Sequence, residues 1–181
     1  MKRLPLVVSL VVLLCFAFAC QNKAEKAELE KFRAQAKLEE QNEAFYRRII
    51  EEVNKGNLDI LKESFAPEYN FYSPSISTKP ISREEANEFT QMILRAFPDF
   101  NFGIKDLTAV GDKVIVNFIY TGTHKGEFQG IPATGNKVEY SAFVVAKIKN
   151  GKIIEEREEF DSIGLMQQLG MELKPKEAEN K

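Results

Sequence analysis

The most constraining feature of the sequence is a set of four strand-like segments in its second half. They span residues 101–110, 113–124, 137–149 and 152–161. Only Asn150 and Gly151 separate the last two segments, and Asn-Gly is a strong signal for a two-residue hairpin turn. Because apolar and polar residues alternate along such strands, one face must be buried. We therefore expect a curved antiparallel sheet that needs a covering layer.

Helical patterns that could supply this layer precede the strands. Apolar residues recur at helical spacing from Phe45 to Val53, and Gly56 ends that helix. A second short helix, capped by Asn57, is expected to end at Pro67. A third, from Ser82 to Phe97, opens with the Ser and Glu of a capping box. With a short helix near the C-terminus, at Ile163 to Leu169, the pattern predicts an α+β domain with one core.

Residues 1–20 are typical of an export signal. Lys2 and Arg3 precede an apolar run that is short for a membrane span and ends at Cys20. The segment Ala17-Phe18-Ala19-Cys20 resembles the lipobox of bacterial lipoproteins, which implies a lipid on Cys20 and a lipid anchor in the cell envelope. In a Gram-negative cell, the resemblance favours the outer membrane, facing the periplasm. An ordinary signal peptide cut nearby is the alternative.

The remaining chain divides into three predicted parts. Residues 21–42 are rich in Ala, Glu and Lys and predict a solvated helical spacer, residues 43–170 form the domain, and residues 171–181 are a disordered charged tail. Both cysteines lie within residues 1–20, so the exported domain would contain no disulfide and no cysteine-ligated metal. The formal net charge of −2, with no basic stripe, argues against a nucleic acid partner.

Several segments of the domain together resemble one known family. They are AFPDFNFGIKDL (96–107), GDKV (111–114), TGTHKGEFQGIPATGNKVEY (121–140), NGKIIEE (150–156) and FDSIGLMQQLG (160–170). In order and spacing they resemble the SnoaL-like polyketide cyclase and ester cyclase family. The resemblance implies a cone-shaped nuclear transport factor 2-like fold, in which a bent sheet wraps helices around an apolar pocket. It also implies a homodimer, and a reaction without metal or cofactor.

Two residues match polar positions of the family motifs. Asp161 matches the aspartate that serves as acid and base in the cyclases, although an aspartate between a strand and a helix can also simply cap the helix. His124, the only histidine, matches a family histidine that could stabilise an enolate oxygen. Its alternative role is to hold the shape of the following loop. The resemblance predicts that both side chains face one pocket.

Other residues are candidates for binding a ligand. Tyr72 replaces a frequent family histidine, and Arg157 stands where a tryptophan is common. If its strand face lines the pocket, Arg157 could bind a carboxylate or phosphate or pair with Asp161; otherwise it is a surface arginine. The aromatic residues expected around the pocket include Tyr46, Phe97, Phe118 and Tyr120.

Two functions follow from these features. The first is an exported domain that binds a small hydrophobic molecule and catalyses a cofactor-free acid/base step of the cyclase or isomerase type. The second is a noncatalytic envelope lipoprotein that binds a hydrophobic ligand or a protein. The pocket should distinguish these two functions, because an enzyme of this type requires polar groups that open into one cavity.

Overall fold

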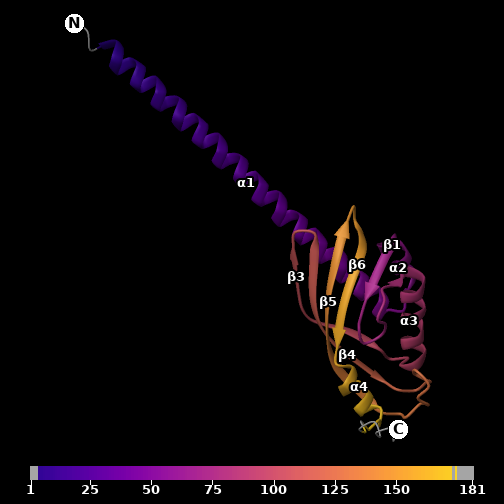
Figure 1. Cartoon of the computed structure of the whole chain (residues 1–181). Helices are drawn as coiled ribbons and strands as arrows, with labels where there is room; N and C mark the ends of the chain where they lie inside the picture. Colours follow the sequence, from indigo (N-terminus) through magenta and orange to yellow (C-terminus); the bar gives the residue numbers. More distant parts are fainter. Residues whose placement is uncertain (1–3, 173, 175–181) are drawn as a thin grey trace, which may run out of the picture. The chain divides into compact units, whose positions relative to one another are not determined.

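The computed structural model describes the backbone of residues 4–172 and 174, and the side chains from residue 23 onward (Figure 1). The chain divides into two compact units, Met1–Leu38 and Glu39–Lys181. The side chain of Cys20 lies outside the described residues, as do Lys2, Arg3 and most of the predicted tail 171–181.

The first unit is helical. Helix α1 (Leu4–Asn54) begins in this unit, and its side chains from Lys23 to Leu38 are exposed. Even the large apolar residues Leu29 and Phe32 are about half exposed or more, at 48% and 61%. Within the part of the chain whose side chains are described, no helix is long and apolar enough to cross a membrane.

A six-stranded sheet forms the second unit, together with the end of α1 and three shorter helices. The helices are α2 (Asp59–Ser64), α3 (Arg83–Ala96) and α4 (Ser162–Gln168), and the strands are β1 (Phe65–Tyr72), β2 (Ile81–Ser82), β3 (Asn101–Val110), β4 (Lys113–Thr123), β5 (Lys137–Lys149) and β6 (Lys152–Phe160). The predicted bounds of β3 to β6 are therefore confirmed to within one residue.

The sheet has the strand order β2-β1-β6-β5-β4-β3. Neighbours from β6 to β3 are antiparallel, as predicted, but β1 runs parallel to β6. The expectation of a wholly antiparallel sheet is thus wrong at this pairing. A long connection separates these two strands in the chain, and such a connection allows a parallel pairing that a hairpin would not.

Local signals explain the turns and helix ends. Asn150 and Gly151 both adopt positive φ angles, of 53° and 69°, as the tight turn between β5 and β6 requires. By contrast, the predicted cap of α2 is wrong: the Asn57 side chain donates a hydrogen bond to Glu52, and Leu58 occupies the cap position. Pro67 lies inside β1, because α2 already ends at Ser64.

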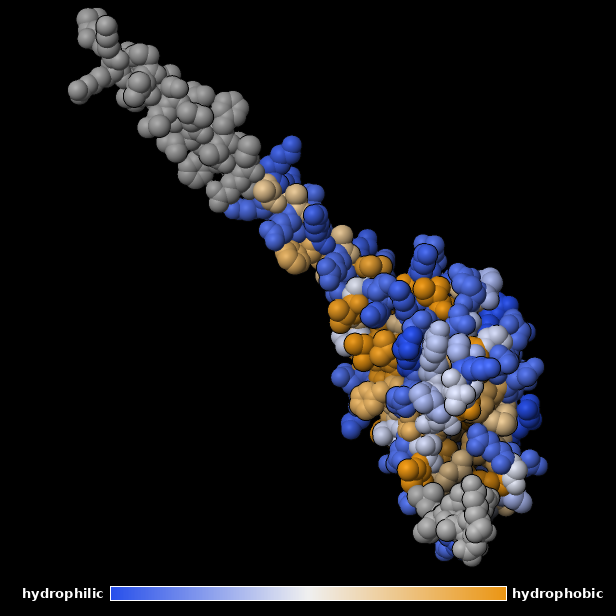
Figure 2. Space-filling model, in the orientation of Figure 1, coloured by the Kyte–Doolittle hydropathy of each residue, from blue (hydrophilic) through white to orange (hydrophobic). Residues whose placement is uncertain are grey.

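The core lies between the sheet and the helices. Alternation along β4 and β5 buries one set of side chains, including Val114, Val116, Ala142 and Val144, against α1, α2 and α3. The opposite face of the sheet is outward and carries exposed apolar residues, of which Phe143 is 55% exposed. In the space-filling view, apolar patches stand among charged side chains on the surface of this unit (Figure 2).

The predicted capping box of α3 is present and can be tested. The Ser82 hydroxyl accepts a hydrogen bond from the Glu85 backbone N–H, and the Glu85 carboxylate accepts one from the Ser82 N–H at 2.7 Å. We expect Ser82→Ala to lower the free energy of unfolding by about 1 kcal/mol, because a backbone N–H loses its partner. Urea denaturation would measure this loss. The matched control is Ser75→Ala, on an exposed loop, and an equal effect of both variants would contradict the capping role.

Candidate active site

The second unit encloses a cavity of about 120 Å³ between the helices and the sheet. Its wall is mostly apolar and contains many aromatic rings. The phenylalanines of the wall are Phe65, Phe71, Phe89, Phe100, Phe102, Phe118, Phe128 and Phe160. They come from the loops as well as from β1, α3, β3, β4 and β6, so distant parts of the sequence meet around one space.

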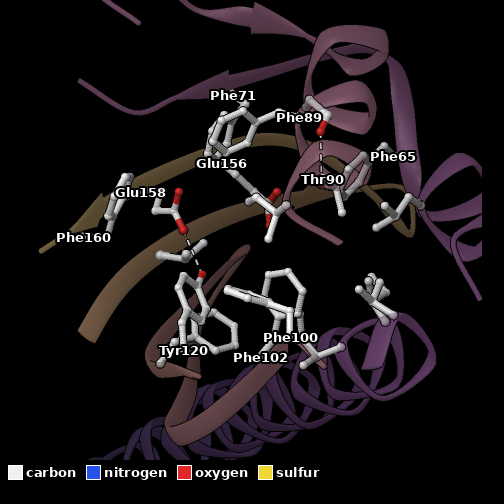
Figure 3. Close-up of a pocket in the computed structure, with 18 of the residues that line it drawn as sticks. Phe65, Phe71, Phe89, Thr90, Phe100, Phe102, Tyr120, Glu156, Glu158 and Phe160 are labelled. Carbon is white, nitrogen blue, oxygen red and sulfur yellow. Dashed lines mark hydrogen bonds between the residues drawn. The ribbon is translucent and has the colours of Figure 1, made fainter. Parts of the chain in front are cut away.

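Two carboxylates lie in this apolar wall (Figure 3). Glu156 and Glu158 both belong to β6 and, two residues apart, project from the same face of the strand. Neither residue was predicted from the sequence to be part of a site. A charged group in such a wall must be compensated by hydrogen bonds or become neutral.

Glu156 is fully engaged by phenols. Its Oε1 accepts a hydrogen bond from Tyr46 on α1 at 2.7 Å, and its Oε2 accepts one from Tyr69 on β1 at 2.5 Å. The residue is only 8% exposed. Burial raises the pKa of this carboxyl, while the two phenol hydrogen bonds oppose that rise. Glu156 therefore joins α1, β1 and β6, and each of its oxygens already accepts a hydrogen bond.

Glu158 is engaged on one side only. Its Oε1 accepts a hydrogen bond from Tyr120 on β4 at 2.8 Å, a bond that Figure 3 shows beside Phe160. No described residue donates to its Oε2, and this oxygen is not among the fully enclosed polar atoms without a partner. Burial raises the pKa of the Glu158 carboxyl from 4.5 to about 7; the Tyr120 hydrogen bond lowers it, and the nearby Glu156 and Glu159 raise it further.

Phenol groups surround these carboxylates. Burial, followed by the negative charge of the glutamates, raises the pKa of Tyr46, Tyr69 and Tyr120 well above 10. The same two causes raise the pKa of Tyr140. At neutral pH these phenols stay protonated and act as hydrogen-bond donors. Tyr140 also lines the cavity, and its hydroxyl has no hydrogen-bond partner among the described residues.

Asp161 does not line the cavity. It is exposed and forms the N-cap of α4, where its Oδ1 accepts a hydrogen bond from the Gly164 N–H at 2.8 Å. A Cβ atom at position 164 would collide with the Asp161 carboxylate, which would have to shift from its capping position. The structure thus shows the capping arrangement, one of the two alternatives for Asp161. The expectation that Asp161 and His124 face one pocket is not met.

His124 holds a loop. It is fully buried, and its Nδ1 accepts a hydrogen bond from the Thr134 N–H at 3.2 Å. Its backbone N–H donates to Asn136, and its carbonyl accepts from Gly135. Since Nδ1 is an acceptor, the ring proton is on Nε2, which has no partner and is enclosed. The ring also stacks on Phe97 at 5.1 Å between centroids.

The predicted ligand-binding residues divide between the two faces of the sheet. Tyr46, Phe118 and Tyr120 line the cavity as expected. Phe97 does not line it but packs against His124 and Phe128.

Tyr72 and Arg157 lie on the outer face, so they are not cavity residues. The Arg157 guanidinium stands 4.3 Å above the centre of the Tyr72 ring, and its Nε donates to Glu155 at 2.8 Å.

A β-bulge explains why Arg157 is a surface arginine, the second of the two alternatives that the sequence left open. The pairing of β5 with β6 shifts by one residue between Lys147–Glu155 and Ile148–Ile153, which leaves Ile154 as an extra residue. Counting by twos from the buried Ile153 would bring Arg157 inside. The extra residue reverses the alternation and brings Glu156 and Glu158 inside instead. Two inward carboxylates could have been suspected only by allowing for such a bulge.

The described residues do not include a cluster of typical metal ligands. Among the described residues, no group of three or more His, Cys, Asp or Glu side chains could hold a metal ion. The polar side chains of the cavity wall are the two carboxyl groups, the phenols and the hydroxyl of Thr90.

This architecture defines a class of protein. Helices packed into a curved mixed sheet, with an apolar cavity between them, form the α+β nuclear transport factor 2-like fold that the sequence predicted. The family model for SnoaL-like polyketide cyclase matches residues 43–169. The chain belongs to the SnoaL-like polyketide cyclase family, as the motifs indicated.

Solved structures agree with this assignment. Wild-type IdmH from Streptomyces antibioticus is 27% identical, with a TM-score of 0.63 over 71% of this chain and 97% of that one. AclR from Streptomyces galilaeus is 25% identical, with a TM-score of 0.65 over 70% and 93%. A SnoaL-like protein from Jannaschia sp. CCS1, at 24% identity, shares the fold with a TM-score of 0.68 over 75% and 96%. No curated protein matches the chain.

The raised pKa of Glu158 predicts a dependence of stability on pH. The folded state favours the neutral carboxyl. The contribution of Glu158 to the free energy of unfolding is therefore fully present below pH 4.5 and is lost as the pH rises towards about 7. Relative to Glu158→Gln, we expect wild type to lose up to about 3 kcal/mol of unfolding free energy between these pH values. Urea titrations at several pH values would measure it.

The matched control for this prediction is Glu88→Gln, which removes the same charge from an exposed position on α3. It should keep the wild-type dependence on pH. Parallel pH curves for wild type and Glu158→Gln would contradict the buried, neutral carboxyl.

Proposed function

We propose that this domain binds a small, mostly apolar organic molecule in its cavity and carries out a cofactor-free acid/base step of the cyclase or isomerase type. The observation that carries the proposal is a carboxylate with an open oxygen inside an aromatic cavity. Membership of the SnoaL-like family supports the same class of reaction.

The size of the cavity supports a small ligand. Its volume of about 120 Å³ is close to that of an engineered cavity of about 150 Å³ that holds one benzene ring. The free energy of binding becomes more favourable when an apolar ring replaces water against an apolar wall, and neighbouring aromatic rings add edge and stacking contacts. The enclosed space therefore suits about one ring, while a larger molecule would have to extend beyond it.

The environment of the carboxylate supports an acid/base step. A general acid or base works best when its pKa lies near the operating pH, and burial brings the Glu158 carboxyl to about 7. Both charge states are then populated near neutral pH. A noncatalytic binding domain, the second candidate, would need the same cavity but no such group.

Filling the cavity should prevent binding. Ala86 on α3 lines the cavity, so we expect Ala86→Trp to occupy the space and weaken ligand binding at least tenfold. The probe is p-cresol, a single ring with one hydroxyl, and its binding to the full-length protein is followed by ligand-observed NMR.

Ala133→Trp makes the same substitution on an exposed loop and should leave binding unchanged. If Ala86→Trp is unstable, Ala86→Leu fills part of the same space. Wild type that shows no saturable p-cresol binding, or binding that is insensitive to residue 86, would count against the proposal.

We further propose that the domain is exported and lipid-anchored through Cys20, on the support of the signal-like residues 1–20. Cys20→Ser should move the protein from the membrane fraction to the soluble fraction, which immunoblotting of fractionated cells would measure. Cys15→Ser is the control, since that cysteine lies within the apolar run. A Cys20→Ser protein that stays with the membrane would refute lipidation.

The expected homodimer also remains a proposal. The outer face of the sheet, with Ile115, Phe143 and Val145 exposed, offers an apolar surface on which a second copy could pack.

A further inference from the structure

We propose that Glu158 and Tyr140 form a proton-transfer pair for a small carbonyl compound with an acidic C–H bond. In this pair, Glu158 takes and returns the proton, and the Tyr140 hydroxyl donates a hydrogen bond to the substrate oxygen. The inference rests on the proposed function, because it needs a ligand in the cavity. It assigns the chemistry to residues other than Asp161 and His124.

The choice between the two buried glutamates follows from their hydrogen bonds. Both oxygens of Glu156 already accept phenol hydrogen bonds, from Tyr46 and Tyr69. A substrate would have to compete with these two bonds to reach this carboxylate. Glu158 uses Oε1 for Tyr120, and no described residue donates to Oε2, so the proton of its neutral form is carried on Oε2.

Tyr140 supplies the second group. Its ring packs edge-on against Tyr120 at 5.4 Å between centroids and against Phe160 at 5.8 Å, which places it beside the residues that flank Glu158. The charge of Glu158 contributes to the raised pKa of Tyr140, so the two groups are close enough to interact. Tyr140 lines the cavity, and its hydroxyl has no hydrogen-bond partner among the described residues, so it is free to donate to a ligand.

Among the described residues, no positively charged side chain lines the cavity to pair with Glu158. Phenols face the space from α1, β1, β4 and β5, namely Tyr46, Tyr69, Tyr120 and Tyr140. The charges that act on Glu158 from its own strand are Glu156 and Glu159. The lining residues of α3 and α4 carry no titratable group, and no Lys or Arg lines the cavity among the described residues.

The step conserves atoms and electrons. The Glu158 carboxylate takes the proton from the carbon next to the carbonyl, and the C–H electron pair forms a C=C bond while the carbonyl pair moves onto oxygen. The enolate oxygen then accepts the Tyr140 hydrogen bond, which strengthens as the negative charge develops. Neutral Glu158 returns the proton to the same or another carbon. Such a cycle needs no oxidant, reductant or metal.

Hydrogen exchange of a simple probe tests the pair. Methyl acetoacetate is a small β-keto ester, and exchange of its C2 hydrogen for deuterium in deuterated buffer is followed by proton NMR. We expect the full-length protein to accelerate exchange above the buffer rate. Glu158→Gln should reduce the protein-dependent rate at least 100-fold, and Tyr140→Phe at least tenfold.

Glu88→Gln is the matched control and should stay within twofold of wild type, because this glutamate is exposed on α3 and does not line the cavity. A further variant, Tyr120→Phe, tests through the pH–rate profile whether the Tyr120 hydrogen bond positions and tunes Glu158. The Tyr120 hydrogen bond lowers the pKa of Glu158, so its loss should move the midpoint of the pH–rate profile upward. An unmoved midpoint would contradict the role of Tyr120.

The outcomes separate this inference from the proposed function. If Glu158→Gln binds p-cresol and still catalyses exchange at the wild-type rate, the pair is wrong while the binding function stands. If wild type binds p-cresol but does not accelerate exchange, the pair is likewise overturned for this class of C–H acid. If wild type binds no p-cresol, the proposed function itself fails.

Discussion

The hydrogen bonds of Glu156 hold the domain around its cavity. One carboxylate joins a phenol from the first helix and a phenol from the first strand, and it does so from the middle of the last strand. Buried carboxylates are costly unless their oxygens are satisfied, so the arrangement is stable only with both phenols in place. The rest of the site depends on this cluster, because it brings α1 and β1 to the same wall as β6.

Glu156 and Glu158 lie on one strand but differ in role: Glu156 holds the fold together, whereas Glu158 is available for chemistry. The two residues share a face, a low-polarity surrounding and a raised pKa, yet only one has an oxygen without a protein partner. The same logic applies to the two residues that match the family motifs. Asp161 and His124 have their hydrogen bonds committed to a helix end and a loop, and the cavity contains neither of them.

Local patterns allowed much of the fold to be predicted from the sequence. The capping box at Ser82 and the Asn150-Gly151 turn depend on residues close together in the chain, and both were confirmed. The carboxylate site could not be predicted in this way. Tyr46 and Glu156 meet across 110 residues, and the bulge at Ile154 reverses the face on which every later residue of β6 lies. Both features depend on tertiary packing, and no local sequence pattern indicates them.

The extra residue in β6 means that the charge of the cavity depends on a bulge as well as on composition. Residues 155 to 159 are all charged, so either face of this strand would carry ionisable groups inward. A regular strand of the same length would bring Glu155, Arg157 and Glu159 inward, whereas the bulge brings in only Glu156 and Glu158. One unpaired residue therefore keeps a guanidinium out of the cavity and leaves carboxyl groups as its only charged side chains among the described residues.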